Sequence, residues 1–401
     1  MTHRPLQGIK VLDFGRFIAG PFCAAILADF GADVIRVEPV EGGNDRIVTP
    51  LGEDLDGATY LPMNRNKRSL AMDLGSPESR EILARLIRSA DIVVANMPPR
   101  ALHKLGLDYE SLRALKPDII LTSVTAFGGQ GPERGSIGFD GTGQAMSGAL
   151  SLTGRPGQPY RAAVSYVDFS TAMTAALGTL AAVMTRRATG EGQQVEASLL
   201  RTALAIMNPI LIEEASGVRT RVATENRSPI AGPSDVFATA DGWIMVQVIG
   251  DDMFERWMQV VGAEDLRGDP RFKDDMARGD NGAVLSERMQ AWCTGRSTAD
   301  CLRLLREKRV PGCPVLSPRQ ALVEPQNVEG GFFHWFRQPG LDRPLPLVSP
   351  LVELSLMAPS PPRSAPVLGA DTRAILREIG FSDEQVADFE QRHLVHAAEP
   401  G

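Results

Sequence analysis

The chain has 401 residues, of which 43% are hydrophobic and 23% charged, and its formal net charge is −7. This length predicts two or three domains, and the composition is that of a globular chain with a sizeable core. The negative charge disfavours nucleic acid and anionic membranes as partners, because both attract basic proteins.

The first part of the chain alternates strand and helix patterns. A β-branched run at 9–14 predicts a strand, Gly20-Pro21 begins an apolar helix that ends near Phe30, and 33–38 is the next strand. Two strands joined by a helix are expected to be parallel, with a right-handed crossover. The same alternation continues in a helix ending at 90, a strand at 91–95, a short helix near 101–105 and a strand at 118–124. We therefore expect a doubly wound α/β layer.

A stretch rich in glycine and proline follows at 126–161. Long irregular segments at the carboxyl ends of parallel strands commonly build the sites of open α/β sheets. After it, the pattern predicts a helix from Asp168 to Arg187, a strand at 194–197 and a helix at 199–214.

The polar segment 216–233 is typical of a domain linker. Beyond it we expect strands around Val236 and at 243–248, and helices that include one capped by Ser297. This smaller α+β segment ends near Glu324. A proline-dense passage follows, and then two capped helices beginning at Asp371 and Ser382.

The four cysteines form no C-x-x-C pair, and the polar first residues do not have the pattern of a signal peptide. The longest nearly apolar run, 172–184, is shorter than the roughly 20 residues that a membrane helix needs. We therefore expect buried free thiols and a cytoplasmic protein.

Several common catalytic motifs are absent from the sequence. There is no G-x-G-x-x-G after the first strand, no phosphate-binding P-loop and no G-x-S-x-G nucleophile motif. These absences disfavour a dinucleotide-dependent dehydrogenase, a P-loop NTPase and an α/β-hydrolase. The five histidines lie in tails or isolated contexts, so no metal site is predicted.

One carboxylate stands out. Asp168 follows an apolar run and precedes a long helix of small residues. On bare sequence the N-cap, which aspartate often fills, is the favoured interpretation, and a nucleophile is the alternative. The partial positive charge of a helix N-terminus is expected to lower the pKa of this carboxyl and keep it ionised, so the two roles are compatible.

The chain resembles the class III CoA-transferases, the family of formyl-CoA transferase and carnitine CoA-transferase, from its first strand nearly to its end. The runs that carry the resemblance are LQGIKVLDFGRFIAGPF (6–22), FGADVIRVEPVEGGNDR (30–46), NRNKRSLAMDL (64–74), DIVVANMPPRALHKLGLDYESL (91–112), FGGQGPERGSIGFDGTGQAMSG (127–148), TGEGQQVEASLL (189–200), FATADGWIMV (237–246) and VPGCPV (310–315). The signal lies in the number and order of these motifs, since no single one is specific.

The resemblance implies a CoA-transferase that moves CoA from an acyl-CoA donor to a carboxylic acid, with Asp168 as the nucleophile. The reaction would pass through a covalent aspartyl-CoA thioester. CoA and acyl-CoA would be substrates, and neither a tightly bound cofactor nor a metal is implied.

The resemblance also implies which residues contact CoA. They are Ile18, Ala19, Met72, Asp73, Leu74, Gly75, Asn96, Met97, Lys104, Gly138, Phe139 and Asp140. Lys104 is a candidate partner for a CoA phosphate, although a solvated helix lysine is an equally good interpretation. Met72 and Met97 are interpreted as apolar packing around the nucleotide.

The sequence departs from the family pattern at several positions. Pro39 and Pro98 stand where many members have arginine, so Arg36, Arg46 or Arg100 would have to serve the phosphates. Formyl-CoA transferases often have glutamine at the position of Ile18. Residues 226–233 replace the glycine-rich loop that folds over oxalate, which makes formate and oxalate poor substrate candidates.

Two alternatives remain. An α-methylacyl-CoA racemase of the same family would need a histidine at the position of Phe139, and phenylalanine moves no proton. A silent CoA-binding protein predicts loss of Asp168, which is present. Neither donor nor acceptor acid is specified by the sequence, although Arg16 and Arg227 are candidates for carboxylate recognition, with solvated arginine as the bland alternative.

Fold and assembly follow from the resemblance. We expect a Rossmann-like doubly wound large domain for CoA, made of 1–215 and 335–401, and linkers with an inserted smaller α+β domain at 216–334. Family members are interlocked homodimers. The expected partners are thus an acyl-CoA, a small carboxylic acid and a second copy of the chain, and neither nucleic acid nor a membrane.

Overall fold

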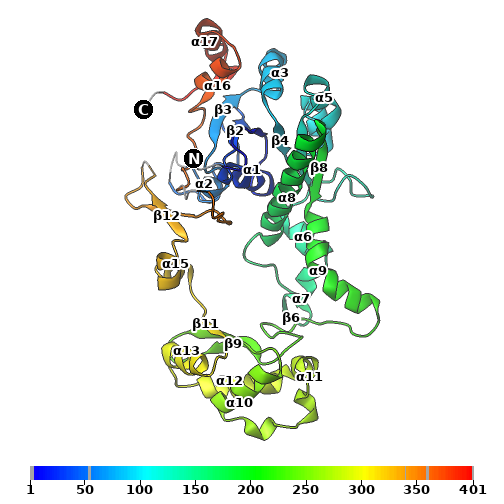
Figure 1. The fold of residues 1–401 in the computed structure, drawn as a ribbon, viewed down its shortest axis with the longest axis vertical. Coiled ribbons are helices and arrows are strands. Elements are labelled where there is room, and N and C mark those ends of the chain that lie inside the picture. The colour runs from blue at the N-terminus through cyan, green and yellow to red at the C-terminus, as the bar shows by residue number, and fades with distance from the viewer. Residues whose placement is uncertain (1–3, 53–55, 339, 358–360, 400–401) are drawn as a thin grey trace. The chain divides into compact units, whose positions relative to one another are not determined.

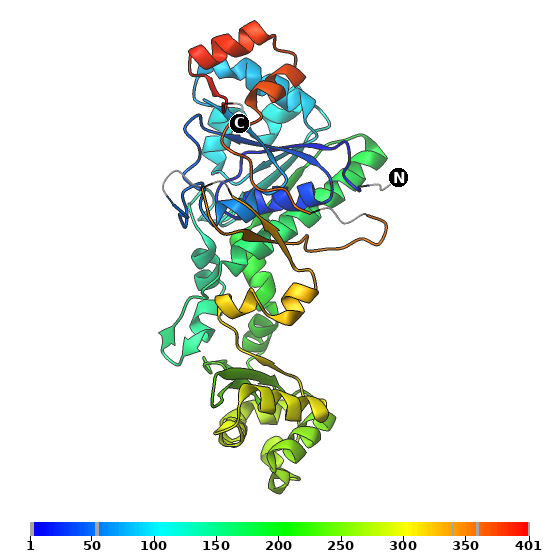
Figure 2. The same ribbon diagram turned by 90° about the vertical axis from the view of Figure 1, so that its left-hand side faces the viewer.

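The computed structural model describes residues 4–52, 56–338, 340–357 and 361–399. Its chain divides into two compact units (Figures 1 and 2). The first comprises Met1–Ser147, Ala163–Ile206 and Gly331–Gly401, and the second comprises Gly148–Ala162 and Met207–Gly330. Residues 148–162 and 207–215, which the sequence assigned to the large domain, therefore group with the second unit, and residues 331–334 group with the first.

A seven-stranded sheet forms the centre of the first unit, in the order β14-β3-β2-β1-β4-β5-β8. Its strands are β1 (Lys10–Asp13), β2 (Asp33–Glu38), β3 (Arg68–Met72), β4 (Ile92–Ala95), β5 (Ile120–Thr125), β8 (Gln194–Ser198) and β14 (Val395–His396). All neighbouring pairs are parallel except β14 with β3. The sheet confirms the expected parallel α/β layer.

Helices cover both faces of this sheet, because successive strand side chains point to opposite sides (Figure 1). Val11 and Val34 pack with α1 (Ala19–Asp29), α8 (Tyr166–Thr189) and α9 (Leu199–Ala215). Leu12 and Ile35 pack on the other face. The helices of that face are α3 (Arg80–Ser89), α4 (Pro99–Leu105), α5 (Tyr109–Leu115), α16 (Thr372–Glu378) and α17 (Asp383–Gln391).

Short elements connect these layers. They are α2 (Tyr60–Met63), η1 (Pro77–Ser79), α6 (Asp140–Met146), and an antiparallel hairpin of β12 (Phe333–Phe336) and β13 (Leu345–Val348). Strand β13 lies in the proline-dense passage and β12 directly precedes it, and the sequence predicted neither strand. The expected caps at Ser297, Asp371 and Ser382 are all found at helix starts.

The second unit has its own core around Trp257 and Phe237. Its sheet is antiparallel, in the order β11-β10-β9, and comprises β9 (Ser234–Ala238), β10 (Trp243–Gln247) and β11 (Gly312–Pro314). Its helices are α7 (Ala149–Leu152), α10 (Asp251–Val261), η2 (Glu264–Leu266), η3 (Pro270–Phe272), α11 (Asp275–Asp280), α12 (Gly282–Cys293), α13 (Thr298–Glu307), α14 (Pro318–Ala321) and α15 (Pro325–Glu329), and a small hairpin joins β6 (Gly154–Arg155) to β7 (Gln158–Pro159). Three cysteines are buried free thiols, whereas Cys313 is exposed.

Helix α8 is longer than the sequence indicated. It has 24 residues and is apolar enough to cross a membrane by length and composition alone. Such a helix is also typical of a protein core, and α8 packs on α1, β5 and β8. The expectation that no segment is long enough to span a membrane is therefore wrong. The packing of α8 against α1, β5 and β8 accounts for its apolar residues.

Candidate active site

A cavity of about 230 Å³ lies at the carboxyl edge of the parallel sheet. Its walls come from residues 16–19 after β1, 96–99 after β4, 124–127 at the end of β5, and 135–139. Strand β1 has β2 on one side and β4 on the other, so the strand order reverses here. Open α/β sheets bind their ligands at this kind of reversal.

Asp168 lines this cavity from the first turn of α8. The helix begins at Tyr166 with Ser165 as its N-cap, so Asp168 is the third helical residue. The expectation that Asp168 itself caps the helix is therefore wrong. Across residues 4–52, 56–338, 340–357 and 361–399, no hydrogen bond or ion pair ends on its carboxylate oxygens, so they remain available for chemistry.

Asp140 holds the start of α8 in place. Its Oδ1 accepts hydrogen bonds from the backbone N–H of Val167 at 2.8 Å and of Asp168 at 3.2 Å, and its Oδ2 accepts one from Gln144. These N–H groups belong to the first turn, where a helix offers them no internal partner. Gly143 permits the approach of α6, since a Cβ there would lie 2.8 Å from Val167 Cγ1. Asp140 is itself 4% exposed.

The pKa of Asp168 is raised to about 7, first by burial and then by the negative charge of Asp140. Sequence reasoning expected a lowered pKa from the helix N-terminus, and this expectation is wrong. A helix terminus contributes about 0.3–1 kcal/mol at an exposed site, which burial and a nearby like charge outweigh. In addition, the first-turn N–H groups of Val167 and Asp168 are directed at Asp140 instead.

The turn between β1 and α1 forms another wall of the cavity. Asn96 fixes it with two hydrogen bonds, because its Oδ1 accepts from Arg16 N at 2.7 Å and its Nδ2 donates to Arg16 O at 2.8 Å. Gly15 and Gly20 approach neighbouring backbone closely, because a Cβ at Gly15 would lie 2.9 Å from Pro21 N and one at Gly20 would lie 3.0 Å from Gly15 Cα. The two glycines of the G-R-F-I-A-G run are thus explained by a tight turn.

Two exposed aromatic rings border the cavity. Phe17 adopts a φ of 63°, which is rare for a residue with a side chain. Its ring meets the Phe139 ring edge to face, with centroids 6.2 Å apart. The Phe139 side chain is 62% exposed, and a large apolar ring exposed beside a cavity is suited to contact a ligand.

The predicted contact residues fall into two groups. Ile18, Ala19, Asn96, Met97, Gly138, Phe139 and Asp168 all line the cavity, and Asp140 lies directly behind Asp168. Met72, Asp73, Leu74, Gly75 and Lys104 are outside its lining. Met72 is fully buried in the core, and its backbone is paired with Val395 of β14, so it is not available to a ligand.

Sequence reasoning missed several lining residues. They are Phe17, Pro99, Val124, Thr125, Ala126, Phe127, Gly135, Ser136, Ile137 and Leu199. Most of them lie inside or beside quoted family motifs, at the carboxyl ends of the predicted strands, and that position is the signal that could have found them.

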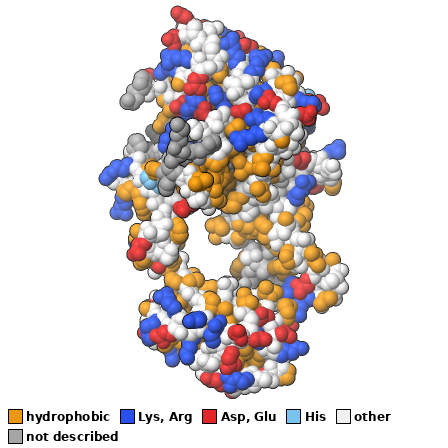
Figure 3. Space-filling model, viewed as in Figure 1, with side chains coloured by type: hydrophobic (Ala, Val, Ile, Leu, Met, Phe, Trp, Pro, Cys, Tyr) orange, Lys and Arg blue, Asp and Glu red, His pale blue; other side chains and the backbone are white. Residues whose placement is uncertain are grey.

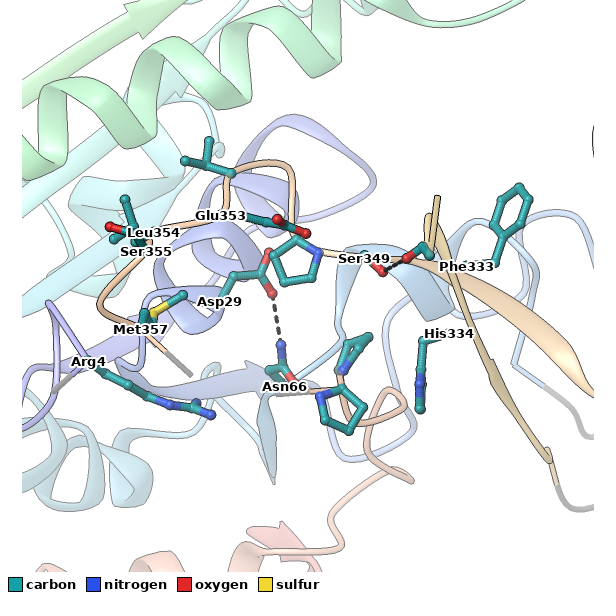
Figure 4. Close-up of a pocket in the computed structure, with 15 residues that line it drawn as sticks. Arg4, Asp29, Asn66, Phe333, His334, Ser349, Glu353, Leu354, Ser355 and Met357 are labelled. Carbon is teal, nitrogen blue, oxygen red and sulfur yellow. Dashed lines mark hydrogen bonds between the residues drawn. The ribbon is translucent and has the colours of Figure 1, made fainter. Parts of the chain in front are cut away.

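A larger cavity of about 600 Å³ lies at the opposite, amino edge of the sheet. Figure 4 shows Asp29 and Asn66 joined by a hydrogen bond, and His334 extending from β12 toward the same space. The remaining wall is mostly the proline-rich segment that follows β13. Among the described residues, no group of histidine, cysteine and carboxylate side chains is arranged to hold a metal ion.

Comparison with known proteins identifies the family. Residues 6–372 match the model of CoA-transferase family III. The chain belongs to that family. It is 33% identical over 397 residues to the succinyl-CoA–D-citramalate CoA-transferase of Chloroflexus aurantiacus, covering 98% of each chain. It is 35% identical to the succinate–glutarate CoA-transferase of Agrobacterium fabrum, over 80% of this chain and 82% of that protein.

The solved structures agree with this assignment. A CaiB/BaiF family protein from Brucella suis superposes with a TM-score of 0.81 at 30% identity, over 94% of this chain and 99% of that one. The chain is therefore an enzyme of the CoA-transferase type, with CoA as part of its substrate.

A family III CoA-transferase must bind an anionic substrate, and the basic residues considered for its phosphates differ in availability. Arg36 is 1% exposed and pairs with Asp45, and Arg46 is 7% exposed and pairs with Glu38 and Asp56. Both are therefore unavailable to phosphates, contrary to the expectation from sequence. Arg16, Arg100 and Lys104 are exposed, and within the described ranges none of the three forms an ion pair.

Proposed function

We propose that this enzyme transfers CoA from an acyl-CoA donor to a carboxylic acid through a covalent thioester on Asp168. The observation that supports this proposal is a partly buried carboxylate with no partner among the described residues, which opens into a cavity where the sheet order reverses. A nucleophile needs free lone pairs and an approach path for the substrate, and Asp168 has both.

The proposed chemistry is a sequence of acyl exchanges. An Asp168 oxygen attacks the donor thioester carbonyl. The C–S bond then breaks, so that CoA departs as the thiolate and an acyl-aspartyl anhydride is formed. The thiolate then attacks the aspartyl carbonyl, which releases the donor acid and forms the aspartyl-CoA thioester. The acceptor carboxylate attacks this thioester, which expels CoA thiolate again and forms a second anhydride. Attack of the thiolate on the acceptor carbonyl gives the new acyl-CoA and restores Asp168.

Each of these steps develops an oxyanion that needs hydrogen-bond donors. The start of α1, at Ile18 and Ala19, borders the cavity. The first N–H groups of a helix have no partner within the helix, and its dipole favours negative charge there. We propose these N–H groups as oxyanion donors, and the cavity residues of the predicted contact set as the seat of the CoA thioester arm.

The names of the relatives support a substrate class. The relative from Chloroflexus aurantiacus is named for succinyl-CoA and D-citramalate, and that from Agrobacterium fabrum for succinate and glutarate. We propose succinyl-CoA as donor and a dicarboxylic acid as acceptor. Racemisation of a 2-methylacyl-CoA is the second candidate, but it would need a proton-transferring group where Phe139 stands.

We also propose that the enzyme is a homodimer in the cytoplasm, interlocked as the family resemblance implies, with neither nucleic acid nor a membrane as partner. Met173, Leu177 and Met184 lie along one exposed face of α8, and Figure 3 shows hydrophobic side chains gathered over this part of the molecule. A second copy of the chain would cover such a face. Sedimentation of the full chain tests this proposal, and a folded monomer at micromolar concentration would contradict it.

Intact-protein mass spectrometry after incubation with succinyl-CoA tests the chemistry. We expect a CoA adduct on Asp168 in the wild-type enzyme and none in Asp168→Ala. Solvent deuterium entering the α-carbon of a 2-methylacyl-CoA, without an adduct, would favour the racemase. Neither signal with any CoA ester would support a silent binding protein.

A further inference from the structure

A buried cluster of charged side chains lies beneath the turn that forms one wall of the Asp168 cavity. Lys67 and Asp13 are both fully buried and form an ion pair, with Nζ 2.6 Å from Oδ2. Asp13 ends β1, and Lys67 immediately precedes β3. Burying two charges is costly unless every hydrogen bond is satisfied, so such a pair calls for an explanation beyond stability.

Lys67 satisfies all three of its N–H donors, and one of them reaches the turn directly. Besides Asp13, its ammonium donates to Pro21 O at 2.8 Å and to Asn64 Oδ1 at 3.0 Å. Asp13 Oδ1 in turn accepts from Gly15 N at 2.8 Å. The ion pair is therefore hydrogen-bonded to both ends of the turn, at Gly15 and at Pro21.

Arg36 and Asn96 complete the grip on the same turn. The Arg36 guanidinium donates to Gly15 O, and Asn96 holds the backbone of Arg16 on both sides. Between these anchors lies Phe17 with its φ of 63°. A side chain persists in this conformation only where its surroundings hold the backbone in place, and such strain is concentrated at functional sites.

We propose that Lys67 is a positioning residue for the transfer reaction, which holds the 15–21 turn in the shape that forms the wall of the Asp168 cavity. This inference rests on the proposed function, because it takes that cavity to be the seat of the CoA thioester. Lys67 itself touches no cavity atom and acts through the turn: Phe17, Ile18 and Ala19 line the cavity, and Lys67 does not.

The charge on Lys67 gives the proposal a signature in pH. Burial lowers the pKa of Lys67 to about 8, although Asp13 acts against this shift, while the positive charges of Arg36 and Arg65 add to it. A further titratable group near it is the Cys23 thiol of α1, whose pKa is raised to about 12, so the thiol stays neutral from pH 7 to 9. Above pH 8 the ammonium loses a proton, and the turn loses an ionic anchor.

The test compares CoA affinity, measured by titration calorimetry from pH 7 to 9, in the full-length enzyme and two variants. Asp13→Asn/Lys67→Met removes both charges of the pair together, and the new amide oxygen can still accept from Gly15 N. Arg36 loses its 3.9 Å ion pair with Asp13 but keeps the one with Asp45 at 2.8 Å. Arg68→Met is the matched control, because Arg68 is the next residue and loses ion pairs with Asp33 and Glu378 without contacting the turn.

We expect the double variant to bind CoA about tenfold to a hundredfold more weakly at pH 7, the scale that small misplacements in a site produce. Arg68→Met should stay within about twofold of wild type, because Arg68 contacts neither the turn nor the cavity lining. Wild-type affinity should fall above pH 8, whereas the double variant should lack this step. Other groups that titrate in this range, including the CoA thiol, affect all three proteins alike, so the step assigned to Lys67 is the difference between the wild-type and double-variant profiles.

Wild-type affinity in the double variant, or the same alkaline step in it, would overturn the role of Lys67. Far-ultraviolet circular dichroism confirms that each variant is folded before titration. The adduct on Asp168 is measured separately, so the two proposals fail independently: an enzyme that forms no adduct but loses CoA affinity in the double variant would contradict the covalent mechanism and uphold the positioning role.

Discussion

The two edges of the central sheet carry cavities of different size and different chemistry. The amino-edge cavity, at about 600 Å³, is the larger, and its wall is mostly the proline-rich segment after β13. The carboxyl-edge cavity, at about 230 Å³, is smaller, but it contains Asp168 and the residues that follow β1, β4 and β5.

The difference lies in the partly buried carboxylate that lines each cavity, since the second carboxylate of the amino-edge cavity, Glu353, is exposed. At the amino edge, Asp29 is neutralised by Arg65 at 2.5 Å and accepts a hydrogen bond from Asn66. At the carboxyl edge, Asp168 forms no ion pair within the described residues, and burial and Asp140 raise its pKa to about 7. A paired carboxylate contributes to stability, whereas a destabilised and unpaired one is typical of a catalytic group. Chemistry, and not volume, therefore distinguishes the site.

The largest expected effect is on catalysis at the carboxyl edge. Asp168→Ala should lower the transfer rate by about a thousandfold or more, because removal of a covalent nucleophile has effects of at least this size. Steady-state assays with succinyl-CoA and a panel of dicarboxylic acids measure it. A variant that retains even a tenth of the wild-type rate would contradict the assignment of Asp168.

The second prediction concerns the cost of the ionised Asp168 side chain to the stability of the folded protein. Its folded pKa of about 7 lies above the unfolded value, so the native state loses stability as the pH rises from the unfolded pKa to the folded one. Asp168→Asn should therefore have a higher urea midpoint at pH 8, with a free energy of unfolding larger by on the order of 2–4 kcal/mol. The gain should shrink below pH 7 and vanish below about pH 4, where the carboxyl is protonated in both states. An unchanged urea midpoint at pH 8 would mean that the ionised Asp168 carboxylate does not destabilise the folded protein.

The third prediction separates the two causes of the raised pKa. Asp140→Asn keeps an oxygen that accepts from Val167 N and Asp168 N but removes the charge. The pKa of Asp168 should fall, so the acid side of the pH–rate profile should move to lower pH. At pH 6 each enzyme retains a fraction of its own plateau activity, and this fraction should be about twofold or more higher in the variant than in wild type. An unmoved profile would leave burial as the sole cause.

Much of the fold could be predicted from sequence because its signals are local. The β-branched runs at β1 and β2 and the proline and glycine that begin and end α1 predict their elements with small errors at the boundaries. Strand β13 was missed because Pro346 weakens its pattern, whereas both strands of a two-stranded hairpin are edge strands, which tolerate proline.

The site depended on contacts that local patterns do not contain. Asp13 and Lys67 are 54 residues apart, and Asp140 and Asp168 are 28 apart. No spacing rule pairs them, since the sheet and the α6–α8 packing bring them together. For the same reason the pKa of Asp168 was expected to change in the wrong direction: a helix terminus is visible in sequence, whereas burial and a neighbouring carboxylate are not.

The smallest expected effect tests the amino edge. His334 extends toward the larger cavity, and removing its imidazole should leave the site around Asp168 intact, because the cavities share no lining residue. His334→Ala should therefore change kcat/KM by less than about twofold, the range usual for substitutions away from catalytic groups. A loss approaching that of Asp168→Ala would break the distinction between the edges, since it would place an essential group in the cavity where the pairing of Asp29 with Arg65 argues for a structural role.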